Sequence, residues 1–98
     1  MEHNLTNDKL TIFLKGELNS YNSEEVEEEI EELIKNNSFN AIVLDMKALD
    51  YISSAGIRII VRLKQQYDDT SLVNVPSSIN DIFEMVGLNK MIKIEKIK

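Results

Sequence analysis

The chain has 98 residues, a formal net charge of −6 and no cysteine. This length suits one compact domain, which we expect over residues 1–98, and the absence of cysteine excludes disulfide bonds and a thiol nucleophile. The acidic balance excludes a typical nucleic-acid surface, and no apolar run suits a membrane span or a signal peptide, so we expect a cytoplasmic protein that binds no membrane.

The first elements expected in the chain are two strands. A weak strand covers His3–Thr6 and turns at Asn7–Asp8. Apolar residues then alternate with others over residues 10–14, which is the period of a largely buried strand. We expect Gly16 and Asn19 to break this strand.

Residues 22–36 have the spacing of an amphipathic helix. Glutamates fill most of the solvent positions, and Glu24 suits the positive end of the helix dipole. Asn22 or Ser23 can cap this helix. The apolar positions that recur at helical intervals are Val26, Ile30, Leu33 and Ile34.

A continuous apolar run from Ala41 to Leu44 predicts a central strand that is buried on both faces. Asp45 closes this strand, so we expect residues 45–54 to form a loop. In a parallel α/β sheet such a loop lies at the carboxyl end of a strand, where ligands and partners bind.

A second helix is expected from Ser54 to Tyr67. Its core side carries Ile57, Ile60, Val61 and Tyr67. Ser54, Arg58 and Arg62 are four residues apart, so they lie on one stripe that faces solvent. The stripe presents a hydroxyl and two guanidiniums, which suit an acidic partner or a phosphate on Ser54 itself.

The last part of the chain is expected to hold a strand at Ser71–Val75 and a final strand over residues 91–97. Between them lies a third helix, capped by Ser77 or Ser78. Its apolar stripe consists of Ile79, Ile82, Phe83 and Val86. Gly87, followed by a leucine, suits the end of this helix. The alternation of strands and helices predicts an α/β fold with a mixed, mainly parallel sheet and three to four helices.

Two adjacent serines, Ser53 and Ser54, begin the second helix and are followed by Ala55 and Gly56. Free backbone N–H groups and the helix dipole favour negative charge there, so a phosphate on Ser54 would be stabilised. Phosphorylation adds nearly two negative charges, which is enough to abolish binding at a docking surface. Gly56 would let another chain approach the backbone closely. The simpler interpretation is that the serines only cap the helix.

Three segments, in order, resemble STAS domains and in particular the anti-sigma factor antagonists. "KGELNSYNSEEVEEEIEEL" resembles the Gly-Glu-Leu-Asp segment that opens into the first helix. "NAIVLDMKALDYISSAGIRII" is similar to the central strand and the phosphorylatable signature that follows it. "VPSSINDIFEMVGLNKMIKI" resembles the last helix, its Gly-Leu and the closing strand. The resemblance covers nearly all of the chain and implies a single STAS domain.

The resemblance implies a regulator of transcription. A member of this family binds a cytoplasmic anti-sigma factor, often a serine kinase with a Bergerat-type ATP site, and so releases a sigma factor. The kinase inactivates the antagonist by phosphorylating a serine, and a PP2C-type phosphatase restores it. By position this serine is Ser54, with Ser53 as the second choice, and Asp45 matches a supporting polar position. The partner-binding residues implied by position are Asn19, Ser53, Ser54, Ala55, Gly56, Ile57, Arg58 and Arg62.

Three positions depart from the family pattern. Ser53 stands where aspartate is frequent, and Asn19 replaces the aspartate that usually follows Gly-Glu-Leu. Arg62 stands where small residues are frequent on the partner-facing helix. The choice between Ser53 and Ser54 therefore stays open. We expect a monomer, with a weak dimer as the alternative.

An enzyme is not expected. The only histidine is His3, near the N-terminus, so no serine has an evident base. No residue set has metal-ligand spacing, and no glycine-rich loop follows the first strand, so we expect neither a metal nor a cofactor. The alternative to a phosphorylation switch is a non-switching STAS scaffold, or a module that senses a small ligand such as a nucleotide.

Overall fold

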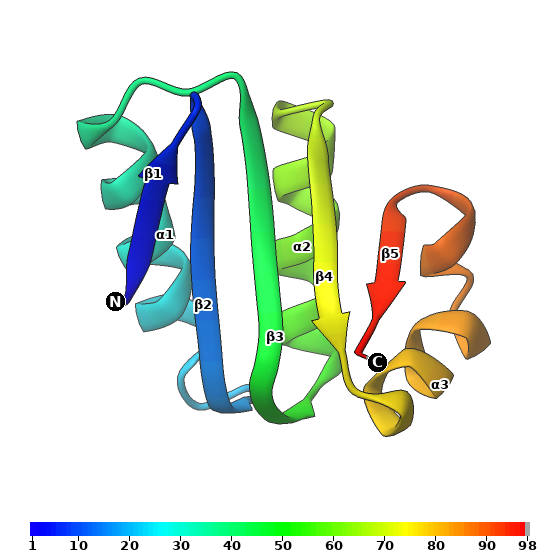
Figure 1. Cartoon of the computed structure of the whole chain (residues 1–98). Helices are drawn as coiled ribbons and strands as arrows, with labels where there is room; N and C mark the ends of the chain where they lie inside the picture. The colour runs from blue at the N-terminus through cyan, green and yellow to red at the C-terminus, as the bar shows by residue number, and fades with distance from the viewer. Residues whose placement is uncertain (98) are drawn as a thin grey trace.

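The computed structural model describes residues 1–97 and folds them into one sheet with helices packed against it (Figure 1). In chain order the strands are β1 (His3–Thr6), β2 (Lys9–Leu18), β3 (Ala41–Ile52), β4 (Thr70–Val75) and β5 (Lys93–Lys96). The helices are α1 (Ser23–Asn36), α2 (Ser54–Gln66), α3 (Ser77–Met85) and the short 3-10 helix η1 (Leu88–Lys90). The predicted α/β fold is confirmed.

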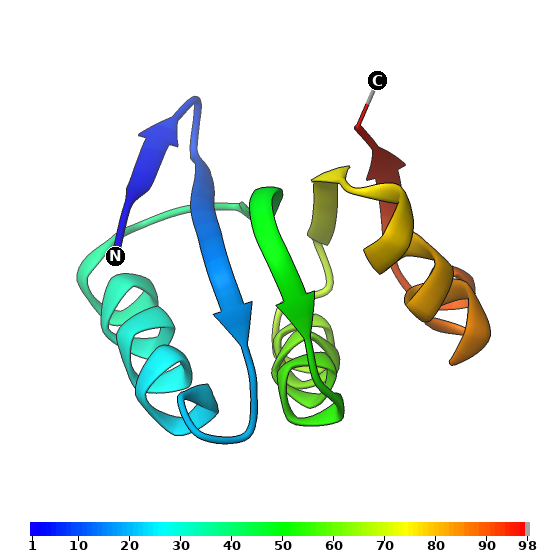
Figure 2. The same ribbon diagram turned by 90° about the horizontal axis from the view of Figure 1, so that it is seen from below.

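The strand order is β1-β2-β3-β4-β5, in which β1 pairs antiparallel with β2 and every other neighbouring pair is parallel. The crossovers through α1, α2 and α3 each move one strand along in the same direction. Because such crossovers are right-handed, successive helices fall on the same face of the sheet. Figure 2 shows α1, α2 and α3 on one side of the strands, so no helix within residues 1–97 covers the other face.

The core lies between the sheet and the helices. Alternate strand residues face the helices and are buried: Leu10, Ile12, Leu14, Ile42, Leu44, Met46 and Leu72. The helices add Ile30, Ile59, Ile60, Leu63, Ile79 and Phe83. Val43 points to the face without helices, yet only 8 % of it is exposed, because Thr11 and Ser71 flank it in register. The central strand is thus buried as predicted, although helices cover only one of its faces.

Two predicted strand ends are wrong. β2 does not break at Gly16 but continues to Leu18, because a glycine with a φ of 69° fits the bulge at which the register with β3 shifts. β3 does not close at Asp45 but runs on to Ile52, so residues 45–52 are strand and not loop. The two strands stay paired as far as Leu18 and Ile52, and this pairing satisfies their backbone groups.

The first hairpin and the position of the first helix are as predicted. Asn7 and Asp8 have φ values of 54° and 62°, the two positive values of a type I′ hairpin turn. α1 starts after Asn22 as predicted, but its N-terminus has no side-chain cap hydrogen bond, so the predicted cap by Asn22 or Ser23 is wrong. The amide of Asn22 is used instead in the loop between β2 and α1.

The third helix differs from the prediction at both ends. Its N-cap position is Pro76 and carries no side-chain cap hydrogen bond, so the predicted serine cap is wrong. α3 ends at Met85, and Val86 is the C-cap residue. Val86 is 57 % exposed, so its predicted place in the apolar stripe is wrong. Gly87 ends the helix region as predicted, with a φ of 78° and with Leu88 buried behind it.

α2 packs closely against the ends of β2 and β3 at Gly56. A Cβ atom at this position would lie 2.7 Å from Cγ1 of Ile52 and 2.8 Å from Cγ of Leu18, and both side chains are buried. Glycine is therefore needed for internal packing. The space that we expected another chain to enter is occupied by Leu18 and Ile52.

We expect Gly56→Ala to lower the free energy of unfolding by about 1–2 kcal/mol, because overpacking outweighs the helix propensity that alanine adds. Urea unfolding followed by circular dichroism measures this change. Gln65→Ala, at an exposed position of the same helix, is the matched control and should change the stability by less than about 0.5 kcal/mol. A Gly56→Ala variant as stable as the parent would contradict the close packing.

Candidate functional site

One residue, Ser53, connects the end of β3 to the start of α2. Its N–H donates to the carbonyl of Leu18 over 2.8 Å, and its carbonyl accepts from the N–H of Ile57 over 3.0 Å. Its Oγ accepts a hydrogen bond from the N–H of Gly56 over 3.4 Å, so Ser53 is the N-cap of α2. Ser53 is half-buried, and both its backbone and its hydroxyl are used to hold the helix start.

Ser54 is exposed and is the first residue of α2. Its hydroxyl has no hydrogen-bond partner among residues 1–97. It lies at the positive end of the helix dipole, where the first N–H groups of the helix have no partner within the helix. The two adjacent serines therefore differ, because one caps the helix and the other presents its hydroxyl to solvent.

The residues after Ser54 differ in accessibility. Ala55 and Ile57 are half-buried, and Gly56 is buried, while Arg58 is exposed. Ile57 packs against the core, as its place on the helix predicts. Ser54 and Arg58 are thus the exposed side chains of the first helical turns.

Arg62, one turn further along α2, is bound to α1. Its Nε donates to Oε2 of Glu27 over 2.8 Å, and its Nη2 donates to Oε1 over 2.7 Å. The pKa of Arg62 is raised, because the Glu27 carboxylate accepts these hydrogen bonds and stabilises the positive charge. The predicted stripe does face solvent, but of its two arginines only Arg58 has no ion pair within residues 1–97.

The loop between β2 and α1, residues 19–22, follows Leu18 and so lies beside Ser53. The side-chain oxygen of Asn19 accepts hydrogen bonds from the N–H of Tyr21, over 2.9 Å, and from that of Asn22, over 3.1 Å. Asn22 in turn accepts from the N–H of Asn19 over 2.9 Å. Asn19, which the resemblance places in the partner surface, thus uses its side chain to shape this loop.

Sequence reasoning missed two exposed aromatic residues at this end of the molecule. Tyr21 is 97 % exposed and Tyr51, near the end of β3, is 48 % exposed. A tyrosine in a loop has no periodicity that would mark it. The available signal was the pair of asparagines on either side of Tyr21, which favours a fixed turn.

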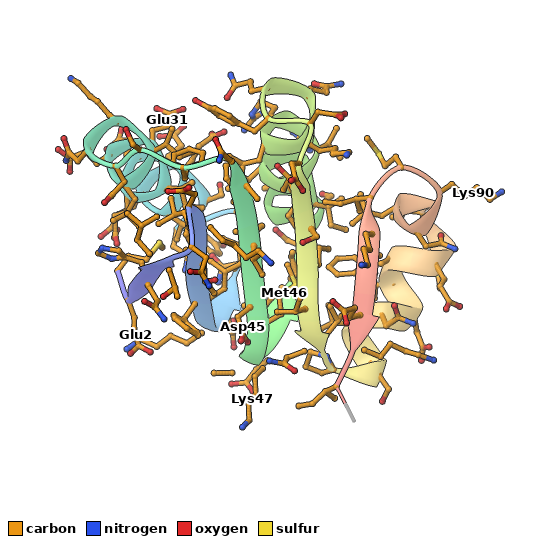
Figure 3. All side chains as sticks on the ribbon, turned by 45° about the horizontal axis from the view of Figure 1, so that its top comes forward. Glu2, Glu31, Asp45, Met46, Lys47 and Lys90 are labelled. Carbon is orange, nitrogen blue, oxygen red and sulfur yellow. The ribbon has the colours of Figure 1, made fainter. Side chains whose placement is uncertain are left out.

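Asp45 lies within β3 (Figure 3), several residues before the strand end that leads to the serines. Its side chain links β3 to β4. Its Oδ1 accepts from the N–H of Lys47 over 3.0 Å, and its Oδ2 accepts from Nδ2 of Asn74 over 2.9 Å. Asn74 has a left-handed backbone, with a φ of 52°, near the end of β4. Asp45 therefore connects β3 to the end of β4 through the hydrogen bond to Asn74.

Within residues 1–97 no three His, Cys, Asp or Glu side chains are grouped to hold a metal ion. None of the helices in this range has the length and hydrophobicity of a membrane-spanning helix. His3 is exposed in β1, at the edge of the sheet. It pairs with Ile12 of β2, so it lies well away from the strand ends that carry the serines.

Comparisons with known proteins identify relatives of the chain. The family model described as STAS domain matches residues 2–97. BtrV of Bordetella bronchiseptica, a protein named as a candidate anti-sigma factor antagonist, is 34 % identical over 85 % of this chain and 78 % of its own length. A solved structure from Thermotoga maritima, described as a candidate anti-sigma factor antagonist, has a TM-score of 0.86 at 19 % identity and covers 97 % of this chain and 85 % of its own.

SpoIIAA, described as an anti-sigma factor antagonist, is another protein of similar fold with a solved structure. Its unphosphorylated form has a TM-score of 0.76 at 19 % identity and covers 95 % of this chain and 85 % of its own. Its phosphorylated form, described as a Bacillus cell fate determinant, has a TM-score of 0.68 at 19 % identity, covering 95 % and 88 % of the two chains. At this level of identity the likeness shows a shared fold.

Ser53→Ala should lower the free energy of unfolding by about 1 kcal/mol, because α2 loses its cap. Ser54→Ala should change it by less than about 0.5 kcal/mol, since its hydroxyl is exposed and unbonded. Urea unfolding of the two variants side by side measures both values. Equal losses of stability would mean that the two hydroxyls share the capping role.

Proposed function

The chain belongs to the STAS domain family, in its anti-sigma factor antagonist group, and from this premise we propose that it releases a sigma factor by binding an anti-sigma factor. Phosphorylation of Ser54 switches this binding off. The members of this group are regulators and not enzymes, which confirms the prediction of a non-catalytic protein. The proposed function is carried out in the cytoplasm by a single copy of the chain.

The different use of the two serines is the observation that carries the choice of Ser54. A kinase needs a hydroxyl that can enter its active site, and Ser54 is exposed and unbonded within residues 1–97. Ser53 is half-buried and accepts the capping hydrogen bond from Gly56. Phosphorylation of Ser53 would remove the cap, whereas phosphorylation of Ser54 leaves it in place.

A phosphate on Ser54 would change the docking surface without unfolding the domain. It adds nearly two negative charges at the start of α2, where the helix dipole stabilises them. On a surface that a partner covers, the same charge and bulk prevent close contact. SpoIIAA, which shares the fold, has been solved in phosphorylated and unphosphorylated forms, and this supports a switch that keeps the fold.

Two partners follow from the proposed switch. One is an anti-sigma factor of the serine kinase class, with a Bergerat-type ATP site, which both binds the chain and phosphorylates Ser54. The other is a PP2C-type phosphatase, which removes the phosphate. The partner surface is centred on Ser54 and Arg58, because these side chains are exposed, while Arg62 is committed to Glu27 of the same chain.

A nucleotide sensor has less support. The sheet face without helices has a hollow of about 510 Å³. The charged side chains lining it are Lys9, Lys64, Lys93, Asp45, Asp68, Asp69 and Glu95. With four carboxylates against three ammonium groups, this lining disfavours a polyphosphate. Ser53 and Ser54 do not line this hollow, so we favour the phosphorylation switch.

Incubation with ATP and a serine kinase of the anti-sigma class from the same genome should add one phosphate to the chain. Mass spectrometry of the digested protein should locate it on Ser54. Ser54→Ala should abolish the labelling, whereas Ser53→Ala should still be labelled at a temperature where it is folded. Labelling of Ser53 in the parent would contradict the choice of Ser54, and no labelling of either serine would contradict the switch and favour the scaffold.

A phosphoserine installed at position 54 should interact with Arg58, four residues along the helix. The guanidinium favours the doubly charged phosphate, so Arg58→Gln should raise the second pKa of the phosphate by about 0.2–0.4, from a starting value of about 6. Phosphorus NMR during a pH titration measures this value. Arg62→Gln is the matched control and should leave it nearly unchanged, since Arg62 is paired with Glu27. Equal effects of the two substitutions would show that Arg58 has no special role.

A further inference from the structure

We propose that Tyr21 and Tyr51 are the aromatic anchors of the surface on which the anti-sigma factor docks. This inference rests on the proposed function, since it names contact residues of that same site. Tyr21 is 97 % exposed and Tyr51 is 48 % exposed. The third tyrosine, Tyr67, packs against Phe39 with ring centroids 5.7 Å apart. Tyrosine is enriched among the residues that dominate binding energy at protein interfaces.

Backbone contacts bring both tyrosines to the start of α2. The N–H of Ser53 donates to the carbonyl of Leu18, and Tyr21 follows Leu18 three residues later in the loop. Tyr51 lies two residues before Ser53 and is paired with Glu17 of β2. Figures 1 and 2 both show the loop between β2 and α1 next to the start of α2. Both residues therefore lie at the end of the molecule that carries Ser54.

The loop holds Tyr21 in place before a partner binds. The N–H of Tyr21 donates to the side chain of Asn19 over 2.9 Å, and Nδ2 of Asn22 donates to the carbonyl of Glu17 over 2.7 Å. A loop that is already ordered loses little conformational entropy on binding, and a tyrosine side chain has few rotatable bonds. Contact with Tyr21 therefore contributes to affinity at a low entropic cost.

The charges around the tyrosines indicate the chemistry of the partner. The exposed carboxylates near them in the chain are Glu17, Glu24, Glu25 and Asp50. Arg58 is the exposed cation on the first turns of α2. The partner that fits is an anti-sigma factor with an apolar pocket for the rings, a basic rim around that pocket and an acidic group opposite Arg58.

A second exposed apolar group, at the end of α3, provides the matched control. Met85 is 83 % exposed and Val86 is 57 % exposed. In Figure 1 α3 lies next to β5, whereas the loop that carries Tyr21 lies on the side of β1 and β2. A substitution at Met85 therefore removes exposed apolar surface without touching the end of the molecule that carries Ser54.

The test measures how the rate of Ser54 phosphorylation depends on the concentration of the chain, with a serine kinase of the anti-sigma class from the same genome. Tyr21→Ala should raise KM about tenfold and Tyr51→Ala several-fold, with kcat unchanged, because docking and not phosphoryl transfer is weakened. Tyr21→Phe keeps the ring and should restore most of the parent KM. Met85→Ala should have the KM of the parent.

The outcomes separate the anchors from the switch. Thermal unfolding should give the parent midpoint for the variants at Tyr21 and Met85, because these side chains are almost fully exposed, and it checks that Tyr51→Ala is folded at the assay temperature. Parent-like KM values for Tyr21→Ala and Tyr51→Ala would contradict the role of the tyrosines as anchors without contradicting the phosphorylation switch. A KM for Met85→Ala as high as that of Tyr21→Ala would place docking elsewhere. If no such kinase phosphorylates Ser54 in the parent, the proposed function fails and the anchors fail with it.

Discussion

The contact of Gly56 with the buried side chains of Leu18 and Ile52 sets the position of the second helix, and the rest of the site depends on it. A Cβ atom at residue 56 would come within 2.7 Å of Ile52, so the helix can approach the strand ends this closely only with glycine. The hydrogen bond from Ser53 to Leu18 then ties the helix start to β2. As a result, the packing beneath it determines that Ser54 lies at the surface.

Much of the fold could be predicted from patterns that depend on neighbouring side chains. The alternation over residues 10–14 and the helical spacing over residues 22–36 arise from which side chains face the core, and both elements are present. The ends of β2 and β3 could not be predicted in this way. Gly16 and Asp45 are residues that locally favour the end of a strand. Pairing between β2 and β3, which are distant in sequence, nevertheless extends both strands beyond these positions.

In the candidate site, too, some features follow from local sequence and others depend on tertiary packing. The exposure of Ser54 and Arg58 on one stripe follows from helical spacing alone, and the structure agrees with it. The bond between Arg62 and Glu27 joins residues 35 positions apart, so it depends on how α1 packs beside α2. The exposure of Tyr21 depends likewise on the shape of a loop. Tertiary packing therefore decided which polar and aromatic side chains remained available to a partner.

Ser53 caps α2, whereas Ser54 has the free hydroxyl. This separation has a cellular consequence. Under the proposed switch, a chance mutation of Ser54 would remove the phosphorylation site while the folding equilibrium stayed nearly the same. Quality-control proteases and chaperones recognise unfolded chains, so they would not clear such a protein. The regulation that we propose would then be lost while the abundance of the protein stayed normal.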